Sequence, residues 1–136
     1  MGYRSEVVLA LDKRLVPALM SAFAQSSKMR DLCTTETDNL ITDYDGEGNW
    51  LMRWDNIKWY DSFPEIYQVE TLLEAIAMGD LTSYGIDIIK DDEGKELPDD
   101  MWDELYKFIR IGEGADDIDQ RGYGFYDVFL TRGINF

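Results

Sequence analysis

The clearest pattern in the chain runs from Thr37 to Tyr60 and reads TDNLITDYDGEGNWLMRWDNIKWY. Its two arms, residues 37–44 and 49–60, contain many of the β-branched and aromatic residues that favour strands. Between the arms lies Asp45-Gly46-Glu47-Gly48, a run of turn-forming residues. The pattern therefore predicts a β-hairpin.

The second arm of this hairpin changes the phase of its alternation. Trp50 and Trp54 share one face, whereas Ile57 and Trp59 continue with period two in the opposite phase. One extra residue in a strand has this effect, so we expect a β-bulge near residues 55–56. If one face cannot bury every tryptophan, an aromatic patch is exposed, and we expect Trp54 and Trp59 to anchor a partner there.

Before the hairpin, alternating apolar residues predict a strand over residues 3–11. Apolar side chains at helical spacing then predict a helix that Asp12 caps and that reaches residue 28 or 29. Proline is tolerated in a first helical turn, so Pro17 leaves two alternatives. Either the helix begins near Val16, or residues 13–16 form a separate turn.

After the hairpin, residues 62–65 read Ser-Phe-Pro-Glu, which has the Ser-x-x-Glu form of a capping box. We expect a helix to follow, with an apolar stripe from Ile66 to Ile76 and a left-handed C-terminal cap at Gly79. Alternation over residues 81–90 then predicts a further strand.

The rest of the chain carries two more strand-like segments, residues 105–111 and 123–131, joined by a glycine-rich, acidic linker. The order strand, helix, strand, strand, helix, strand matches the split β-α-β-β-α-β plan of ferredoxin-like domains. We therefore expect an α+β, ferredoxin-like fold with an antiparallel sheet and an added C-terminal β-hairpin. With 136 residues, 45% of them hydrophobic, the chain fits one domain over residues 1–136.

The composition excludes several classes of catalytic and metal site. The chain has no histidine and a single cysteine, Cys33. It therefore lacks the residues for histidine-based acid/base catalysis, for Ser-His or Cys-His nucleophiles, for His/Cys zinc sites and for internal disulfides. We expect no catalytic residue, no cofactor and no metal site, and hence no enzyme.

Three weaker motifs do not change that expectation. Residues 43–48 begin like a calcium loop, but the twelfth position, which needs a bidentate glutamate, is Trp54. Asp116 and Asp117 form a carboxylate pair, yet neighbours on a loop do not establish the opposed geometry of glycosidase-like catalysis. Residues 121–129 are partly similar to the aromatic strand of ferredoxin-like RNA binders. The chain lacks the basic surface that RNA binding requires.

The formal net charge of -15 is large for so small a domain, and it is regional. Residues 1–34 carry five basic and three acidic side chains, whereas residues 35–136 carry eight and 25. Solubility needs a net charge of only about 2 to 8, and further self-repulsion destabilises a fold. Nucleic acid and anionic membranes are repelled, so we expect neither as a direct partner.

The densest acidic run spans residues 87–104. One interpretation is a solvated loop that keeps the protein soluble. The other is an interaction surface for a basic protein, whose nucleic-acid groove such carboxylates would occupy in place of phosphates. In the second interpretation, the partner-binding carboxylates of the run are those of Asp87, Asp91, Asp92, Glu93, Glu96, Asp99, Asp100, Asp103 and Glu104.

The sequence also predicts a compartment. The first apolar run is too short for a signal peptide, and no uncharged apolar segment approaches the roughly 20 residues of a membrane span. A single unpaired thiol suits a reducing environment. We therefore expect a cytoplasmic protein.

Three short segments resemble small proteins encoded by bacteriophages and prophages. They are residues 2–7, 54–60 and 108–113, which read GYRSEV, WDNIKWY and FIRIGE. The resemblance implies an accessory phage protein acting in the host cytoplasm, in a group that includes small acidic inhibitors of host nucleases, polymerases and defence complexes. It implies no functional residue, because none of the three segments is a catalytic signature.

These observations favour a stoichiometric binding protein over an enzyme. We expect it to bind a basic host protein, such as a nucleic-acid-binding enzyme or a defence complex, as an inhibitor or nucleic-acid mimic. The alternative is a structural or assembly protein that self-associates through a sheet edge or through residues 50–60. A carboxylate-dependent enzyme is the third hypothesis.

Overall fold

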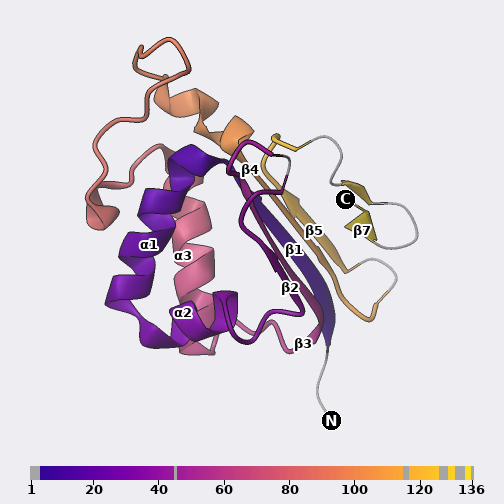
Figure 1. Cartoon of the computed structure of the whole chain (residues 1–136). Coiled ribbons are helices and arrows are strands. Elements are labelled where there is room, and N and C mark those ends of the chain that lie inside the picture. The colour runs from indigo at the N-terminus through magenta and orange to yellow at the C-terminus, as the bar shows by residue number, and fades with distance from the viewer. Residues whose placement is uncertain (1–3, 45, 115–116, 126–128, 131–133, 136) are drawn as a thin grey trace.

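The computed structural model describes residues 4–44, 46–114, 117–125, 129–130 and 134–135. An antiparallel sheet forms one layer, and helices cover one of its faces (Figure 1). The α+β class expected from the sequence is therefore confirmed.

Five strands form the sheet: β1 (Ser5–Leu11), β2 (Asn39–Ile41), β3 (Trp50–Ile57), β4 (Tyr106–Ile111) and β5 (Ile118–Arg121). They lie in the order β2-β3-β1-β4-β5, and every neighbouring pair is antiparallel. A four-stranded ferredoxin-like sheet has no strand in the place of β5, so the ferredoxin-like assignment is not confirmed. A separate two-stranded ribbon consists of β6 (Phe129–Leu130) and β7 (Ile134–Asn135).

The helices lie together on one side of the sheet (Figure 1). They are α1 (Val16–Gln25), α2 (Ser27–Cys33) and α3 (Pro64–Met78), with the 3₁₀ turns η1 (Lys13–Leu15), η2 (Thr82–Tyr84) and η3 (Asp99–Leu105). The longest of them, α3, has 15 residues. In the part of the chain that the structure describes, no helix is both long and apolar enough to cross a membrane.

The segment after β1 shows where the helix that contains Pro17 begins. The turn η1 forms separately, and the carboxylate of Asp12 caps it. Helix α1 begins at Val16, so Pro17 lies in its first turn, where a missing N–H costs nothing. The single helix expected from the sequence is broken at Ser26, whose hydroxyl accepts a hydrogen bond at the start of α2.

The predicted hairpin and its bulge are confirmed. Strand β2 pairs with β3, although β2 is shorter than the arm predicted for it. Along the β1–β3 pair, Ser5 lies opposite Ile57 and Val7 lies opposite Trp54, so β3 contains one extra residue between the two pairs. The bulge therefore falls at residues 55–56, where the change of phase placed it.

Helix α3 also follows the prediction at its C-terminal end but not at its start. Gly79 caps the helix in the left-handed region, with φ at 70°. The expected capping box is wrong, because the helix begins at Pro64 and the N-cap residue is Phe63, which has no side-chain acceptor. Ser62 stands one residue too early to fill that role.

The strand expected over residues 81–90 is wrong. The chain forms the turn η2 there, and Gly85, with φ at 78°, reverses its direction. Leu81 and Ile86 form only an isolated bridge. A left-handed residue in the middle of the segment prevents the extended run that its alternation suggested.

The fourth strand of the sheet is instead β4, and its hairpin partner differs from the prediction. We expected residues 105–111 to pair with residues 123–131. The structure pairs β4 with β5, which lies inside the predicted linker. Of residues 123–131, only 123–125 and 129–130 are among the described residues.

The sheet is buried on both faces around β1. On the helix side, Leu9, Trp54 and Phe108 belong to the main core. On the opposite side, Val8 and Ile109 belong to a smaller apolar cluster. Such double burial explains why β1 reads as an almost continuous apolar run.

Candidate functional site

The acidic run lies in an excursion between α3 and β4. We name residues 85–105 the acidic lobe; it includes η3 and stands at the upper left of Figure 1. A hydrogen bond from the Leu97 N–H to the Ile89 carbonyl, at 2.7 Å, joins the outgoing and returning segments of the lobe. Ile89 and Trp102 are buried and anchor the lobe to the core. The lobe is thus a folded part of the domain.

Three of the predicted carboxylates in the lobe are already engaged. Asp91 accepts hydrogen bonds from the backbone of Glu93 and Lys95, both at 2.9 Å, and so holds the lobe's turn. Asp92 pairs with Arg14 at 2.5 Å, and Glu93 pairs with Lys95 at 3.8 Å. Exposed pairs of this kind contribute little free energy.

In the described part of the chain, no basic side chain forms an ion pair with the other predicted carboxylates. Asp103 is half-buried, and its Oδ1 has no hydrogen-bond partner among the described residues. Within the same described part of the chain, five exposed carboxylates form neither a hydrogen bond nor an ion pair: Asp87, Glu96, Asp99, Asp100 and Glu104. These five can attract a cation without first breaking an internal contact.

Trp54 and Trp59 are not exposed anchors, and that expectation was wrong. Their exposed fractions are 1% and 8%. The indole of Trp54 donates to the Leu32 carbonyl at 3.0 Å, and the two tryptophan rings lie 5.4 Å apart. The bulge adds a residue, so the change of phase brings both rings to the same helix-facing side of the sheet.

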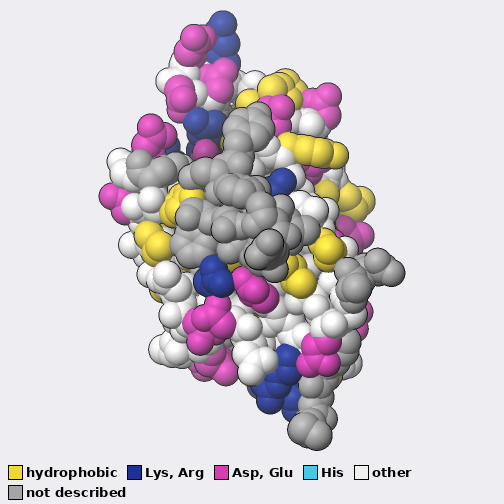
Figure 2. Space-filling view, turned by 90° about the vertical axis from the view of Figure 1, so that its right-hand side faces the viewer, with side chains coloured by type: hydrophobic (Ala, Val, Ile, Leu, Met, Phe, Trp, Pro, Cys, Tyr) yellow, Lys and Arg dark blue, Asp and Glu magenta, His cyan; other side chains and the backbone are white. Residues whose placement is uncertain are grey.

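Acidic side chains are not confined to the lobe. Figure 2 views the molecule from the right-hand side of Figure 1. On this face acidic side chains lie near the top, along both flanks and below the centre, with basic side chains among them. Acidic and basic side chains are therefore interspersed on this face of the molecule.

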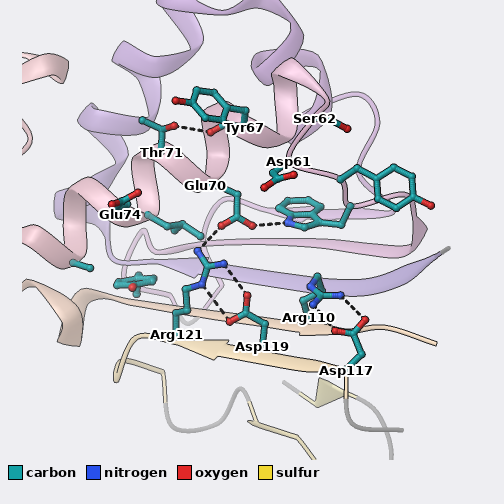
Figure 3. A pocket seen from close by; sticks show the side chains of 15 residues that line it. Asp61, Ser62, Tyr67, Glu70, Thr71, Glu74, Arg110, Asp117, Asp119 and Arg121 are labelled. Atoms are coloured by element: carbon teal, nitrogen blue, oxygen red, sulfur yellow. Dashed lines mark hydrogen bonds and ion pairs between the residues drawn. The ribbon is translucent and has the colours of Figure 1, made fainter. Parts of the chain in front are cut away.

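A hollow lies between α3 and the β4–β5 edge of the sheet. This α3–β5 cleft measures about 970 Å³. Helix α3 forms one wall, β4 and β5 form the other, and residues 59–62 close one end (Figure 3). Its lining consists of Trp59, Tyr60, Asp61, Ser62, Tyr67, Glu70, Thr71, Leu73, Glu74, Ala77, Tyr106, Arg110, Asp117, Asp119 and Arg121.

Arg121 joins the two walls of the cleft. Its guanidinium pairs with Glu70 of α3 at 2.5 Å and with Asp119 of β5 at 2.7 Å, and it lies 5.1 Å from the centre of the Phe108 ring. Burial alone would lower the pKa of Arg121, but the hydrogen bonds to Asp119 and Glu70 outweigh it and raise the pKa. The group is therefore a fixed positive charge, and each of its three nitrogens contacts a carboxylate.

Arg110 is neutralised in the same way. It lies opposite Asp119 in the sheet and binds Asp117 through two hydrogen bonds, of 2.6 and 3.1 Å. It also donates to the Ser5 hydroxyl at 3.3 Å. The cleft thus offers five carboxylates against two guanidiniums, and both guanidiniums face carboxylates already.

Two carboxylates and one tyrosine ring of the cleft are open to a ligand. Asp61 and Glu74 are exposed, and within the described part of the chain they form no hydrogen bond or ion pair. Tyr67 is 57% exposed, which leaves its ring accessible. Burial, followed by the negative charge of Asp103, raises the pKa of Tyr106 to about 12, so its hydroxyl stays protonated at neutral pH.

In the described part of the chain, no three potential metal-ligating side chains come together. In the calcium-like segment, Asp43 accepts a hydrogen bond from the Gly48 N–H at 2.7 Å and so closes a turn. Asp45 lies outside the described residues. Cys33 is buried, and burial raises the pKa of its thiol to about 12, so it is not a reactive thiolate.

The sequence did not identify this cleft. Of the predicted partner-binding residues, only Trp59 lines it, through an indole that donates to Glu70 at 2.9 Å. The others lie in the acidic lobe or, like Trp54, in the core. The lining comes from residues 59–62, from α3 and from the β4–β5 hairpin. No local sequence pattern predicts that these segments meet.

Comparison of the chain with models of protein families, with curated proteins and with solved structures gave no match.

Proposed function

We propose that this protein binds a basic segment of another protein in the α3–β5 cleft and performs no chemistry on it. The observation that carries the proposal is the pairing of charges in the cleft. Arg110 and Arg121 are held by carboxylates, whereas Asp61 and Glu74 are unpaired in the described structure and stand near an exposed tyrosine ring. Such a site attracts a lysine or arginine side chain through Coulomb and cation–π interactions.

The same pairing argues against an anionic ligand. A phosphate or nucleic-acid strand would have to displace Asp117 or Asp119 from an arginine and would then face the other carboxylates of the cleft. The basic surface that supplies most nonspecific affinity for nucleic acid is also lacking in a chain of net charge -15.

In this proposal the acidic lobe contributes attraction at a distance. Its five unpaired carboxylates are exposed, so their field reaches about one Debye length, roughly 8 Å at physiological salt. Exposed charges of this kind raise the association rate more than the final affinity. We therefore assign the lobe to the capture of a basic partner and the cleft to holding it.

The resemblance to phage accessory proteins fits the same role. We include in the proposal that the partner is a basic host protein, such as a nucleic-acid-binding enzyme, and that this chain inhibits it by occupying its basic surface. Duplex DNA would then compete with this protein for the partner.

We also propose a finer description of the fold, a ferredoxin-like unit extended by an edge strand. It is supported by the positions of β3 and β4 on either side of β1 and by the β2–β3 hairpin on one flank. Strand β5 is the extension in this description, and it carries Asp119 and Arg121 of the cleft.

The proposal is tested by titrating the protein with an octapeptide of alternating lysine and threonine, followed by calorimetry. An octapeptide of alternating glutamate and threonine is the charge control. We expect the double variant Asp61→Asn/Glu74→Gln to bind the lysine peptide about tenfold or more weakly, since hydrogen bonds to charged groups contribute roughly 1.5 to 3 kcal/mol.

The matched control removes the same two kinds of charge from the lobe, in Asp87→Asn/Glu96→Gln. We expect this control to weaken binding at low salt and to have little effect at physiological salt, because exposed charges are screened. Equal losses in the two double variants, or equal binding of the glutamate peptide, would overturn the assignment of the cleft.

The alternative of self-association is decided by sedimentation of the protein alone. Strand β3 is internal to the sheet, so residues 50–57 offer no free edge, and only β2 and β5 end the sheet. The binding proposal expects a monomer at all accessible concentrations. A concentration-dependent dimer without peptide would favour an assembly role instead.

A further inference from the structure

Strand β5 ends the sheet on the side where the cleft opens (Figure 3). A sheet edge presents unpaired backbone groups on which another strand can pair. In the part of the chain that the structure describes, β4 is the only strand that pairs with β5. Its other side is therefore a candidate for strand addition.

The register shows which backbone groups point outward. The Gly112 N–H donates to the Asp117 carbonyl at 2.7 Å, so these two residues bond across the start of the hairpin. Bonded pairs alternate along an antiparallel ladder, which makes Arg110–Asp119 and Phe108–Arg121 the next bonded pairs. The N–H and C=O groups of Ile118 and Gln120 must then point away from β4.

Side chains alternate in the same way. Asp119 and Arg121 face α3 and line the cleft, whereas Ile118 and Gln120 are exposed on the other face of the sheet. A strand added to β5 would lie about 4.8 Å beyond it. Every second side chain of that strand would then rise on the cleft side, next to Asp119 and beneath Glu74 and Tyr67 of α3.

We propose that the occupant of the cleft is an extended basic segment of a partner protein, which pairs with the free edge of β5 as a sixth strand. A lysine or arginine of that segment lies opposite Asp119, and its alternate side chains fill the α3–β5 cleft. The backbone bonds to Ile118 and Gln120 hold the segment, and the carboxylates select basic side chains. This inference rests on the proposed function and adds the conformation and position of the bound segment.

Charge complementarity is the reason to choose this occupant over an apolar strand. Asp119 and Glu70 share the single charge of Arg121, and Glu74 on the wall above them is unpaired in the described structure, so this part of the cleft keeps a surplus of negative charge. The opposite-facing residue Ile118 is 44% exposed and offers only a small apolar contact. Strand β5 itself reads Ile-Asp-Gln-Arg and carries no net charge, so a second copy of this chain would bring no surplus cation to the unpaired carboxylates of the cleft.

The test uses the lysine–threonine octapeptide in three forms: unmodified, N-methylated on every lysine, and N-methylated on every threonine. In an extended strand the N–H groups of alternate residues point to opposite edges, so each methylated peptide has one edge blocked. We expect one methylated form to lose binding about tenfold or more and the other to bind like the unmodified peptide. Hydrogen exchange at the amides of Ile118 and Gln120 should slow when the unmodified peptide is added.

A protein variant supplies the complementary result. Gln120→Pro removes one outward N–H and no bond to β4, a position at which an edge strand tolerates proline. We expect this variant to bind the unmodified peptide about tenfold more weakly and Gln120→Thr to bind it normally. If Gln120→Pro fails to fold, the methylated peptides still decide the question.

The outcomes separate this inference from the proposed function. If both methylated peptides bind as well as the unmodified one, strand addition is wrong while cationic binding in the cleft stands. If the unmodified peptide itself does not bind, the proposed function fails. A dimer in which the Ile118 and Gln120 amides are protected before any peptide is added would replace the partner segment by a second copy and overturn the inference.

Discussion

Arg121 is the side chain that ties the cleft together at the scale of single residues. It belongs to β5, pairs with Glu70 of α3 and rests on the ring of Phe108 in β4. Glu70 in turn accepts a hydrogen bond from the Trp59 indole. One guanidinium thereby fixes the distance between the two walls of the cleft, a role that a more flexible lysine with its single charge centre would not fill.

We predict a measurable coupling between Glu70 and Arg121. Glu70→Gln, Arg121→Met and the double variant form a thermodynamic cycle, and urea unfolding gives the free energy of each. Because the pair is half-buried and hydrogen-bonded, the coupling should be about 1 to 2 kcal/mol, above the value of a surface pair. A coupling energy of zero within experimental error would mean that Arg121 does not join the walls energetically.

The tryptophans show how far residue-level prediction reaches. Their spacing correctly predicted the bulge at residues 55–56, because a change of phase has a defined structural cause. The conclusion drawn from it, that Trp54 and Trp59 are exposed, was wrong, since a bulge resets the phase and keeps both rings on the helix side. Sequence shows that the phase changes, but only the folded sheet shows which face results.

At the scale of elements, the predicted parts are those in which apolar side chains face the core. Strand β1, the β2–β3 hairpin and α3 all have that pattern. Strand β5 was missed because its pattern is reversed: Asp119 and Arg121 face the helix, and Ile118 faces outward. Alternation rules assume an apolar inner face, and a charged cleft under α3 violates that assumption.

The turn after β5 yields a prediction about backbone contact. Gly122 has φ at 84°, and a Cβ there would collide with the backbone of Tyr106. Gly85 has φ at 78° and open space around it. Both Gly→Ala variants incur a similar strain in the left-handed region, so the comparison isolates the collision.

We therefore expect Gly122→Ala to lower the free energy of unfolding by about 2 kcal/mol more than Gly85→Ala, a typical effect of overpacking. Urea unfolding of both variants measures the difference. Similar losses in the two variants would show that the end of β5 is not held tightly against the start of β4.

At the scale of the whole molecule, the cleft is a product of long-range assembly. Its lining combines residues 59–62, α3, β4 and β5, whose meeting depends on the position of β4 beside β1. The sequence showed an excess of carboxylates and so predicted a basic partner, and that part remains a prediction. It could not show which carboxylates are already paired, because Asp117 and Asp119 look the same in sequence as Asp61 and Glu74.

The free energy of unfolding of the whole domain should fall in alkaline solution, where the carboxylates are already fully ionised and do not titrate. Burial raises the pKa of Cys33 from an ordinary 9.0 to about 12, and burial with the Asp103 charge raises that of Tyr106 from 10.0 to about 12. Above pH 9 the unfolded chain loses these protons first, so the folded state binds more protons and the free energy of unfolding decreases as pH rises. The stabilisation is complete below pH 9 and is lost through pH 12.

Two variants show which group causes each part of this decline in the free energy of unfolding. Cys33→Ala should remove the part that begins near pH 9 and Tyr106→Phe the part that begins near pH 10, each with a slope of up to about 1.4 kcal/mol per pH unit. Each substitution also shifts the whole curve by its packing cost, so the informative quantity is the difference in slope from the unsubstituted protein. Lysine deprotonation acts on all three proteins alike and cancels in that difference. Parallel curves from pH 8 to 12 would mean that neither group is as buried in solution as the fold requires, and the packing of α2 on the sheet and of the helix-facing side of β4 would need revision.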